Sequence, residues 1–412
     1  MNSAPSKFLW YLAGVTSQFI PFGIHNVLFA WLIVVHLGEG GVRLGFAQMS
    51  AQLPGLVFIL FGGLLADRLD RKLILIGFHC LAALPVYLLA ISINFGAISY
   101  YLLIIVAIAI GTFNAFIQPA RDSLLNQVAG SNLQRAVTLT MGLSFAAQIV
   151  GYGVASRADA VGPVPLLIIQ GTLLLLGAAF ATRLPSSLVV RDSLQGAQER
   201  ARKGHLADIG DGLALMFRST RMAPVMVLMF AVGIFYMGAF SVINPLVVRD
   251  VYGGAAADIA LSYSCFMVGT IFSTALLVAF GGIKRQGLGL MSALAVGGIC
   301  LAITNFGLPF YGYLICLGLW GICGGIAMSL GRVIVQESAP ASFRARSLSV
   351  YSLGTLGGMP IGSILMGNLV VILGPLDCLL VAVAGIAVTV LLVWSTTEMV
   401  SVNRMSLTEE EK

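Results

Sequence analysis

The sequence predicts an all-α membrane protein with twelve transmembrane helices in two pseudo-symmetric six-helix bundles. Of its 412 residues, 58% are hydrophobic and 10% are charged, and the mean hydropathy is +0.96. A water-soluble core does not need that much apolar sequence. Long apolar segments follow one another, each long enough to cross a bilayer at about 20 residues. One polar segment near the middle divides them into six and six.

The apolar segments give twelve predicted spans. Their ranges are 8–35, 42–66, 72–94, 98–125, 133–156, 162–184, 219–248, 256–281, 286–307, 309–336, 345–371 and 376–396. With both termini in the cytoplasm, only Arg43, Arg157 and Arg249 of the 23 Lys and Arg residues fall on the opposite side. This is the positive-inside bias. The net charge of +6 therefore sets the topology and predicts no nucleic-acid partner.

The polar segment 186–218 carries charges of both signs. It predicts four parts: an N-terminal bundle (1–185), a cytoplasmic linker (186–218), a C-terminal bundle (219–398) and a cytoplasmic tail (399–412). Apolar residues recur at helical spacing over 205–217. We therefore expect a short amphipathic helix along the membrane surface in the linker.

The two halves also resemble each other in sequence. Three pairs share one offset of 211 residues: Arg121 with Arg332, Arg135 with Arg346, and Gly151 with Gly362. The arginines flank the turn from span four to span five and the turn from span ten to span eleven. Duplicated six-helix halves are typical of transporters that move around a central site.

The turn between spans two and three reads Gly63-Leu64-Leu65-Ala66-Asp67-Arg68-Leu69-Asp70-Arg71-Lys72. Lipid tolerates such a charge cluster only at its water-facing edge. The segment resembles the signature loop of the major facilitator superfamily, Gly-x-x-x-Asp-Arg-x-Gly-Arg-Lys/Arg. Where the family has Gly, this chain has Asp70, which would be strained if the loop needed a positive φ there.

Within the superfamily, the chain is similar to one particular branch. The Asp-Arg-x-Asp-Arg loop and the run Phe116-Ile117-Gln118-Pro119-Ala120-Arg121 resemble macrolide exporters, siderophore (enterobactin-type) exporters and lysophospholipid transporters. The resemblance implies alternating access with a cytoplasmic gate. The implied gating residues are Gly63, Asp67, Arg68, Arg71, Asp122, Arg344 and Arg346. Arg71 would pair with Asp122, and Arg344 and Arg346 near span eleven would pair with Asp67.

In the family fold, spans one, four, seven and ten line a central cavity. Polar and aromatic residues recur on one helical face in three of these spans. They are Gln18, Phe22, His25 and Asn26 in span one, Asn114, Gln118 and Arg121 in span four, and Tyr236, Phe240 and Asn244 in span seven. Amides and imidazoles are costly in lipid, so these side chains face a wet cavity or bond to neighbouring helices. The aromatic residues suit a large, partly apolar ligand.

His25 is the candidate proton-coupling residue, because an imidazole titrates near physiological pH. The alternative for His25 is a buried, hydrogen-bonded histidine without a transport role, and we expect His79 to be structural. Every Asp and Glu falls in a loop, at a helix end or in the tail. This pattern disfavours a cationic substrate. It favours a neutral, zwitterionic or anionic one, with Arg121 as a distant counter-charge.

The sequence thus predicts a secondary active transporter that exports an amphiphilic small molecule, such as a siderophore or a macrolide-like compound, in exchange for protons. A facilitator or lysophospholipid transporter of the same fold is the alternative, and a non-transporting scaffold or sensor a remote one. Clustered nucleophile–base pairs and metal-ligand motifs do not occur, so we expect no enzyme, no metal site and no cofactor beyond a proton gradient. We interpret the six cysteines as apolar residues of the predicted spans. We expect a monomer in the bacterial inner membrane.

Overall fold

The structure is a computed structural model that describes residues 4–129, 133–186, 214, 216–340 and 344–403. Within these ranges, the side chains of 4–6, 59–64, 66–68, 133–134 and 344–346 lie outside the description. The amphipathic helix predicted over 205–217 falls largely on residues that are not described.

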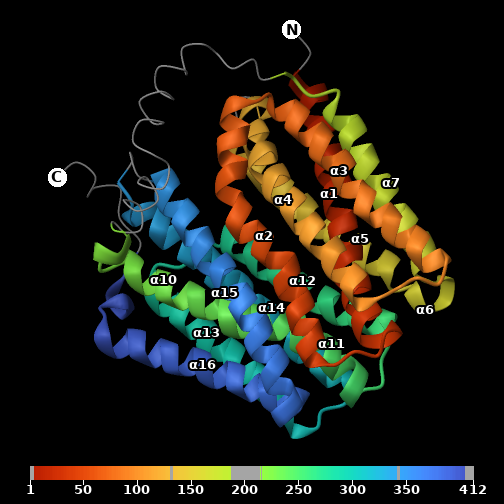
Figure 1. Ribbon diagram of the computed structural model, residues 1–412. Helices are drawn as coiled ribbons and strands as arrows, with labels where there is room; N and C mark the ends of the chain where they lie inside the picture. The colour runs from red at the N-terminus through yellow and green to blue at the C-terminus, as the bar shows by residue number, and fades with distance from the viewer. Residues whose placement is uncertain (1–3, 130–132, 187–213, 215, 341–343, 404–412) are drawn as a thin grey trace. The chain divides into compact units, whose positions relative to one another are not determined.

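The described residues form helices and no strands (Figure 1). The elements of the first half are α1 (Ala4–Trp31), η1 (Leu32–His36), α2 (Gly41–Arg68), α3 (Arg71–Asn94), α4 (Tyr100–Val128), α5 (Leu133–Ala155), α6 (Ala158–Val161) and α7 (Pro163–Ala181). Those of the second half are α10 (Met222–Ala231), η2 (Val232–Met237), η3 (Ala239–Ile243), α11 (Asn244–Leu246), η4 (Val247–Val251), α12 (Ala256–Ala279), α13 (Gln286–Ile303), η5 (Thr304–Phe306), α14 (Phe310–Ser338), α15 (Arg344–Leu373), α16 (Pro375–Thr396) and η6 (Met399–Ser401). The elements η1 to η4 are π-helical, and η5 and η6 are 3₁₀ turns.

The predicted fold class is confirmed. Among the described residues, 11 helices are long and apolar enough to cross a membrane. The 28-residue helix α2, part of which lacks described side chains, has the length for a twelfth. The span Met222–Val251 differs from the others because it passes through three π-helical stretches, η2, η3 and η4.

The chain forms two compact units. The first contains Met1–Gly196 and Pro245–Ser264, and the second contains Ala197–Asn244 and Cys265–Lys412. The sequence predicted a boundary at the linker alone, whereas the segment Pro245–Ser264 groups with the first six spans. The end of span seven and the start of span eight therefore belong to the first unit.

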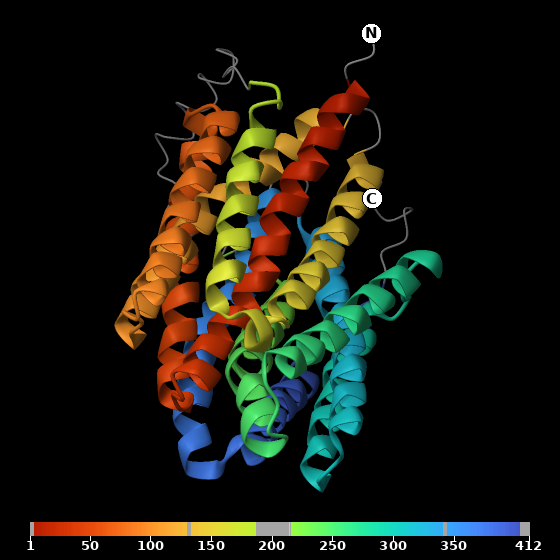
Figure 2. The same cartoon turned by 90° about the vertical axis from the view of Figure 1, so that its right-hand side faces the viewer.

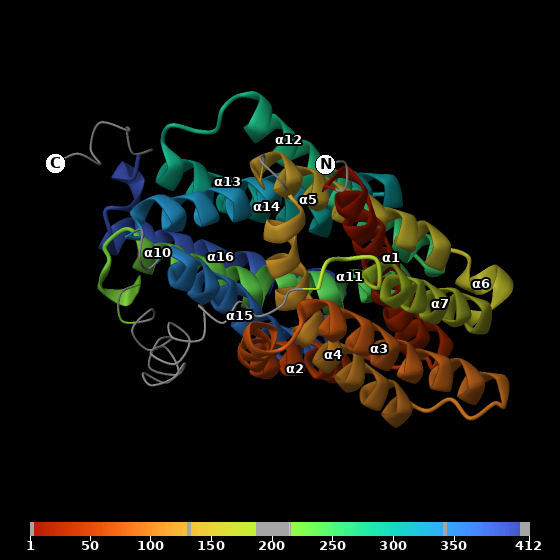
Figure 3. The same ribbon diagram turned by 90° about the horizontal axis from the view of Figure 1, so that it is seen from above.

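Each unit repeats the same helix pairing. In the first unit α1 packs on α5 and α7, α2 packs on α4, and α3 packs on α4 and α7. Figure 2 shows α1 in red between α5 and α7. In the second unit α10 and η2 pack on α15, and α13 packs on α14 and α16. Figure 3 shows α15 running beside α10. The duplicated sequence thus folds into duplicated contacts.

Glycine permits close helix–helix contact in each unit. A Cβ atom on Gly151 of α5 would lie 2.3 Å from the carbonyl oxygen of Ile20 on α1. A Cβ atom on Gly362 of α15 would lie 2.0 Å from the carbonyl oxygen of Ile234 in η2. Since lipid gives apolar faces little reason to associate, such backbone approach is a main source of helix–helix attraction in membranes. The two glycines paired by the sequence offset therefore have the same structural role.

The turn before α3 shows how the chain accommodates Asp70. Asp70 has φ −62° and ψ 116°, and its carboxylate accepts a hydrogen bond from the backbone N–H of Lys72. It is the N-cap of α3, a position where Asp is strongly preferred. A positive φ, and the strain it would bring, is therefore absent at this residue. Asp replaces the family Gly at a position that favours a capping side chain.

The glycine contact in α5 can be tested with two substitutions on the same helix. We expect Gly151→Ala to lower the stability of the purified protein by about 1–3 kcal/mol, because overpacking forces the backbones of α1 and α5 apart. Gly153→Ala is the control, since a Cβ there meets no atom within 4 Å. Thermal unfolding in detergent measures both variants. Equal melting temperatures would contradict the close-contact role of Gly151.

Candidate functional site

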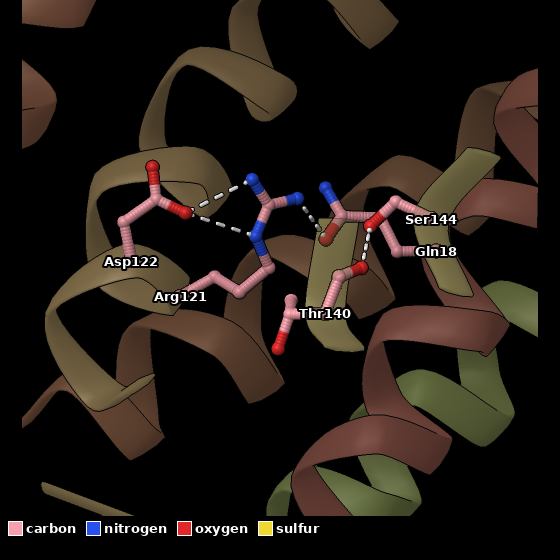
Figure 4. A network of polar contacts seen from close by, with 5 residues as sticks. All are labelled: Gln18, Arg121, Asp122, Thr140 and Ser144. Carbon is pink, nitrogen blue, oxygen red and sulfur yellow. Dashed lines mark hydrogen bonds and ion pairs between the residues drawn. The ribbon is translucent and has the colours of Figure 1, made fainter. Parts of the chain in front are cut away.

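A charged polar cluster connects α1 and α4 in the first unit (Figure 4). Arg121 donates from Nη1 to Gln18 Oε1 at 3.1 Å, and from Nε and Nη2 to Asp122 Oδ1 at 3.2 and 3.0 Å. Its guanidinium carbon lies 4.9 Å from the centre of the Phe19 ring. Three different groups therefore hold one cation, each by a geometry that a planar guanidinium allows.

The two partners in this ion pair differ in exposure. The Arg121 side chain is 13% exposed, whereas that of Asp122 is 59% exposed. The carboxylate of Asp122 is thus largely solvated, and its attraction to Arg121 is weakened by water. A competing carboxylate or phosphate can replace it on the guanidinium at little cost. Arg121 is therefore a suitable anchor for a polar or anionic group.

Span one brings only some of its predicted residues to this cluster. Gln18 is buried against Arg121, whereas Phe22 is exposed. The ring of His25 stacks on Phe29 with centroids 5.0 Å apart, inside the first unit. Asn26 shares a side-chain hydrogen bond with Tyr152. In span four, Asn114 is half-buried and Gln118 is exposed.

The predicted residues of span seven have partners within the second unit. The Tyr236 hydroxyl donates to the carbonyl of Leu294 at 2.7 Å, and Asn244 Oδ1 accepts from the Tyr313 hydroxyl at 2.8 Å. Phe240 lies 5.7 Å from the Trp320 ring, centroid to centroid. The polar atoms of Tyr236 and Asn244 thus bond to neighbouring helices, one of the two interpretations that the sequence allows. That the polar and aromatic residues of spans one, four and seven all face one common cavity stays a prediction.

The predicted cytoplasmic gate lies mostly outside the description. Gly63, Asp67 and Arg68 lie in α2 and Arg344 and Arg346 in α15, but the surroundings of these residues are not described. Asp122 is paired with the adjacent Arg121. Its predicted pairing with Arg71, which has contacts of its own, stays a prediction.

A second polar cluster, which the sequence reasoning missed, joins Pro245–Ser264 to the rest of the first unit. Asp159 of α6 accepts at Oδ1 from the Trp31 indole N–H and at Oδ2 from the backbone N–H of Ala256, both at 2.8 Å. Asp159 therefore caps the N-terminus of α12 from another helix.

Arg249 of η4 makes the other half of this second cluster. Its Nη1 donates to the carbonyls of Val34 and Glu39 at 2.6 and 2.9 Å, and its Nη2 donates to Asp250 Oδ2 at 3.1 Å. The sequence did hold a signal for this residue. Arg249 is one of only three basic residues that the predicted topology places on the non-cytoplasmic side, and an exception to a charge bias points to a specific partner.

The second unit contains a cavity of about 260 Å³. It lies between the end of α12, the start of α13 and the last turns of α14. It is mostly apolar and includes Glu337, whose Oε2 accepts from Gln286 Nε2 at 3.1 Å. Its size is just below the range of about 300–1,000 Å³ for sites that hold drug-sized ligands.

Long apolar helices with polar clusters between them define a multi-pass membrane protein. A family model described as "Transmembrane secretion effector" matches residues 6–409. The chain belongs to this family of major facilitator superfamily transporters.

Characterised relatives are efflux proteins. The chain is 24% identical over 371 residues to macrolide efflux protein A of Streptococcus pyogenes, covering 88% of this chain and 89% of the relative. It is 23% identical over 359 residues to the multidrug efflux pump Tap of Mycolicibacterium fortuitum, covering 84% of this chain and 85% of that pump. Family and relatives are transporters rather than enzymes.

Solved structures share the fold at low sequence identity. The nucleoside transporter NupG matches with a TM-score of 0.74 and 16% identity, over 96% of this chain and 99% of that one. The D-xylose–proton symporter matches with a TM-score of 0.70 and 14% identity, over 95% and 98%. At these identities the likeness shows the fold alone.

The role of Asp159 can be measured directly at the start of α12. In Asp159→Asn, an amide N–H₂ would face either the indole N–H or the backbone N–H that the carboxylate accepts from. We expect hydrogen exchange at Ala256 to become about tenfold faster, which corresponds to the loss of one charge-assisted bond of about 1.5 kcal/mol.

The matched control is Asp377→Asn in the second unit. The carboxylate of Asp377 accepts a hydrogen bond from the side-chain amide of Asn305. That substitution should leave exchange at the start of α12 unchanged. Equal protection of Ala256 in the wild type and in Asp159→Asn would show that the cap does not stabilise this helix end.

Proposed function

We propose that this protein exports an amphiphilic small molecule, of the siderophore or macrolide type, across the bacterial cell membrane in exchange for protons. Arg121, held by Gln18, Asp122 and Phe19, is the observation that carries the proposal. A buried guanidinium on a membrane helix is costly, and its most exposed partner is the one that a ligand can replace.

The relatives support the export direction and the ligand class. Their names describe macrolide efflux and multidrug efflux, and the family description is that of a secretion effector. An amphiphile with hydroxyl, carbonyl or carboxylate groups fits one strong donor with an aromatic ring beside it. Arg121 supplies up to five N–H donors to such groups, while Phe19 offers an apolar face.

The second polar cluster fits an alternating-access cycle. Asp159 and Arg249 fasten Pro245–Ser264 to the first unit by hydrogen bonds to charged groups, worth about 1.5–3 kcal/mol each. Spans seven and eight continue from this segment into the second unit. We propose that these contacts form and break once in each cycle. Such contacts are strong enough to hold one state and weak enough to release it.

The proposed topology has both termini in the cytoplasm, on the basis of the positive-inside bias. Arg43, Arg157 and Arg249 then lie on the outer side. We further propose that the protein acts as a monomer, since each half of the repeat supplies one bundle of the transport unit.

Transport by a conservative variant tests the role of Arg121. In proteoliposomes with an imposed pH gradient, we expect Arg121→Lys to weaken the apparent affinity for erythromycin about tenfold, because lysine keeps the charge but loses the planar fork. Arg157→Lys, at an exposed position, is the control and should transport like the wild type. Unchanged transport by Arg121→Lys would remove Arg121 from the substrate site.

Energy coupling separates the exporter from the alternative functions. We expect erythromycin or enterobactin to accumulate against its gradient only while the pH gradient is maintained, and to stop when an ionophore collapses it. Transport that continues downhill at the same rate without the gradient would indicate a facilitator. Movement of lysophosphatidylcholine but not of the other two compounds would indicate a lipid transporter.

A further inference from the structure

A small polar cavity lies inside the first unit, beside the Arg121 cluster. Its volume is about 20 Å³, enough for one water molecule, which needs roughly 10–15 Å³. The polar side chains around it are Tyr11, Gln18, His79 and Arg121. The remaining wall belongs to an apolar core cluster that includes Val15 and Leu75.

Two polar atoms that line this cavity have no hydrogen-bond partner among the described residues. They are the Tyr11 hydroxyl and His79 Nε2, on side chains that are 2% and 3% exposed. Leaving such an atom unpaired in an apolar interior costs about 1–3 kcal/mol. A cavity of this size with polar walls has room for one water that would satisfy both atoms.

The protonation of His79 follows from its other nitrogen. Nδ1 lies 2.7 Å from the carbonyl oxygen of Leu75. Because a carbonyl only accepts, Nδ1 must carry the hydrogen, and Nε2 of the neutral ring is a bare acceptor. The ring is held in place on its other side by Gly177 of α7, where a Cβ would lie 2.7 Å from His79 Cδ2. The free lone pair of His79 is thus fixed at the cavity wall.

His25, the proton carrier that the sequence suggests, has a poorer environment. Its cavity of about 10 Å³ is at the lower limit for a water, and apart from Gln170 the residues around it are apolar. Nothing charged lines that cavity. Gln170 Oε1 in that cavity has no hydrogen-bond partner among the described residues, but the cavity beside His79 has about twice the room for a proton-donating water.

We propose that His79, rather than His25, binds the exchanged proton, on Nε2, by transfer from the water that it shares with Tyr11. The proton arrives as hydronium in the cavity and leaves a neutral water. The imidazole becomes an imidazolium with N–H groups on both nitrogens, and release reverses the step. This inference rests on the proton-linked transport proposed above and names its proton site.

The surrounding charges explain why proton and substrate would exclude each other. From α4, Arg121 lines the cavity and interacts electrostatically with His79, while its partner Asp122 lies outside the cavity lining and is exposed. From α1 the facing groups are Tyr11 and Gln18, and α7 contributes Gly177 and Ala181.

A charged His79 repels Arg121 across the cavity. It thereby weakens the contact between Arg121 and Gln18, which positions the guanidinium for the substrate group. Binding of the proton and binding of the substrate each disfavour the other, which is the linkage that exchange requires.

Nitrogen NMR of the protein labelled with ¹⁵N-histidine tests the site without any transport assay. The chain has four histidines, and the variants His79→Gln and His25→Gln assign the signals of these two by loss of a signal. Because burial and the nearby Arg121 guanidinium disfavour the imidazolium, we expect His79 to show one protonated and one bare nitrogen at about pH 8 and to gain the second proton only as the pH is lowered toward about 4. A His79 ring that keeps one proton across this range, in protein that stays folded, would overturn the inference.

Substrate binding gives a second readout that a structural role would not move. For the wild type, erythromycin affinity should fall with acidification by up to about tenfold per pH unit, the limit for one linked proton. His79→Gln should bind erythromycin with an affinity that no longer varies with pH, while His25→Gln should behave like the wild type. The opposite result for the two variants would assign the proton to His25.

These readouts separate the inference from the proposed function. If erythromycin does not bind, the proposed substrate is wrong, but the NMR titration still decides whether His79 takes a proton. If His79 does not titrate while the protein exports erythromycin in exchange for protons, the function stands and the site is wrong.

Discussion

Backbone contact at glycine is the constraint on which both units depend. In lipid, an apolar helix face gains little by leaving the hydrocarbon for another helix. Helices that must stay together therefore approach until a glycine on one meets a carbonyl on the other. Gly151 against Ile20 fixes the register of α5 on α1. Gln18 lies two residues from that contact on α1, and its side-chain oxygen accepts a hydrogen bond from Arg121 of a third helix, α4.

Most of the fold could be predicted from the sequence, because membrane spans are long and their ends are polar. The N-termini of α2, α3 and α12 lie within a residue of the predicted limits. The duplicated glycines could also be paired from their spacing alone. Asp70 could not be understood that way. Its departure from the family motif suggested strain, whereas the residue caps α3 with an ordinary φ. Whether Asp is strained or favourable at this position depends on the local backbone geometry.

The candidate site was less predictable, for two physical reasons. A stripe at helical spacing assumes 3.6 residues per turn, and span seven departs from this in η2 and η3. Tyr236 and Asn244 consequently bond within their own unit. The second reason is that partners come from distant helices. Tyr11, His79 and Arg121 line one cavity from three helices, and no local pattern in the sequence connects them.

The π-helical turns of span seven have a mechanical consequence. Turns closed by hydrogen bonds between residues five apart hold more residues per unit length than α-helical turns. Converting even one of them to α-helical spacing would lengthen the span and rotate everything that follows it. Arg249 lies at the end of that run, in η4. A change of winding in η2 would therefore turn and advance the residues that follow it, including Arg249, whose guanidinium donates to the carbonyls of Val34 and Glu39.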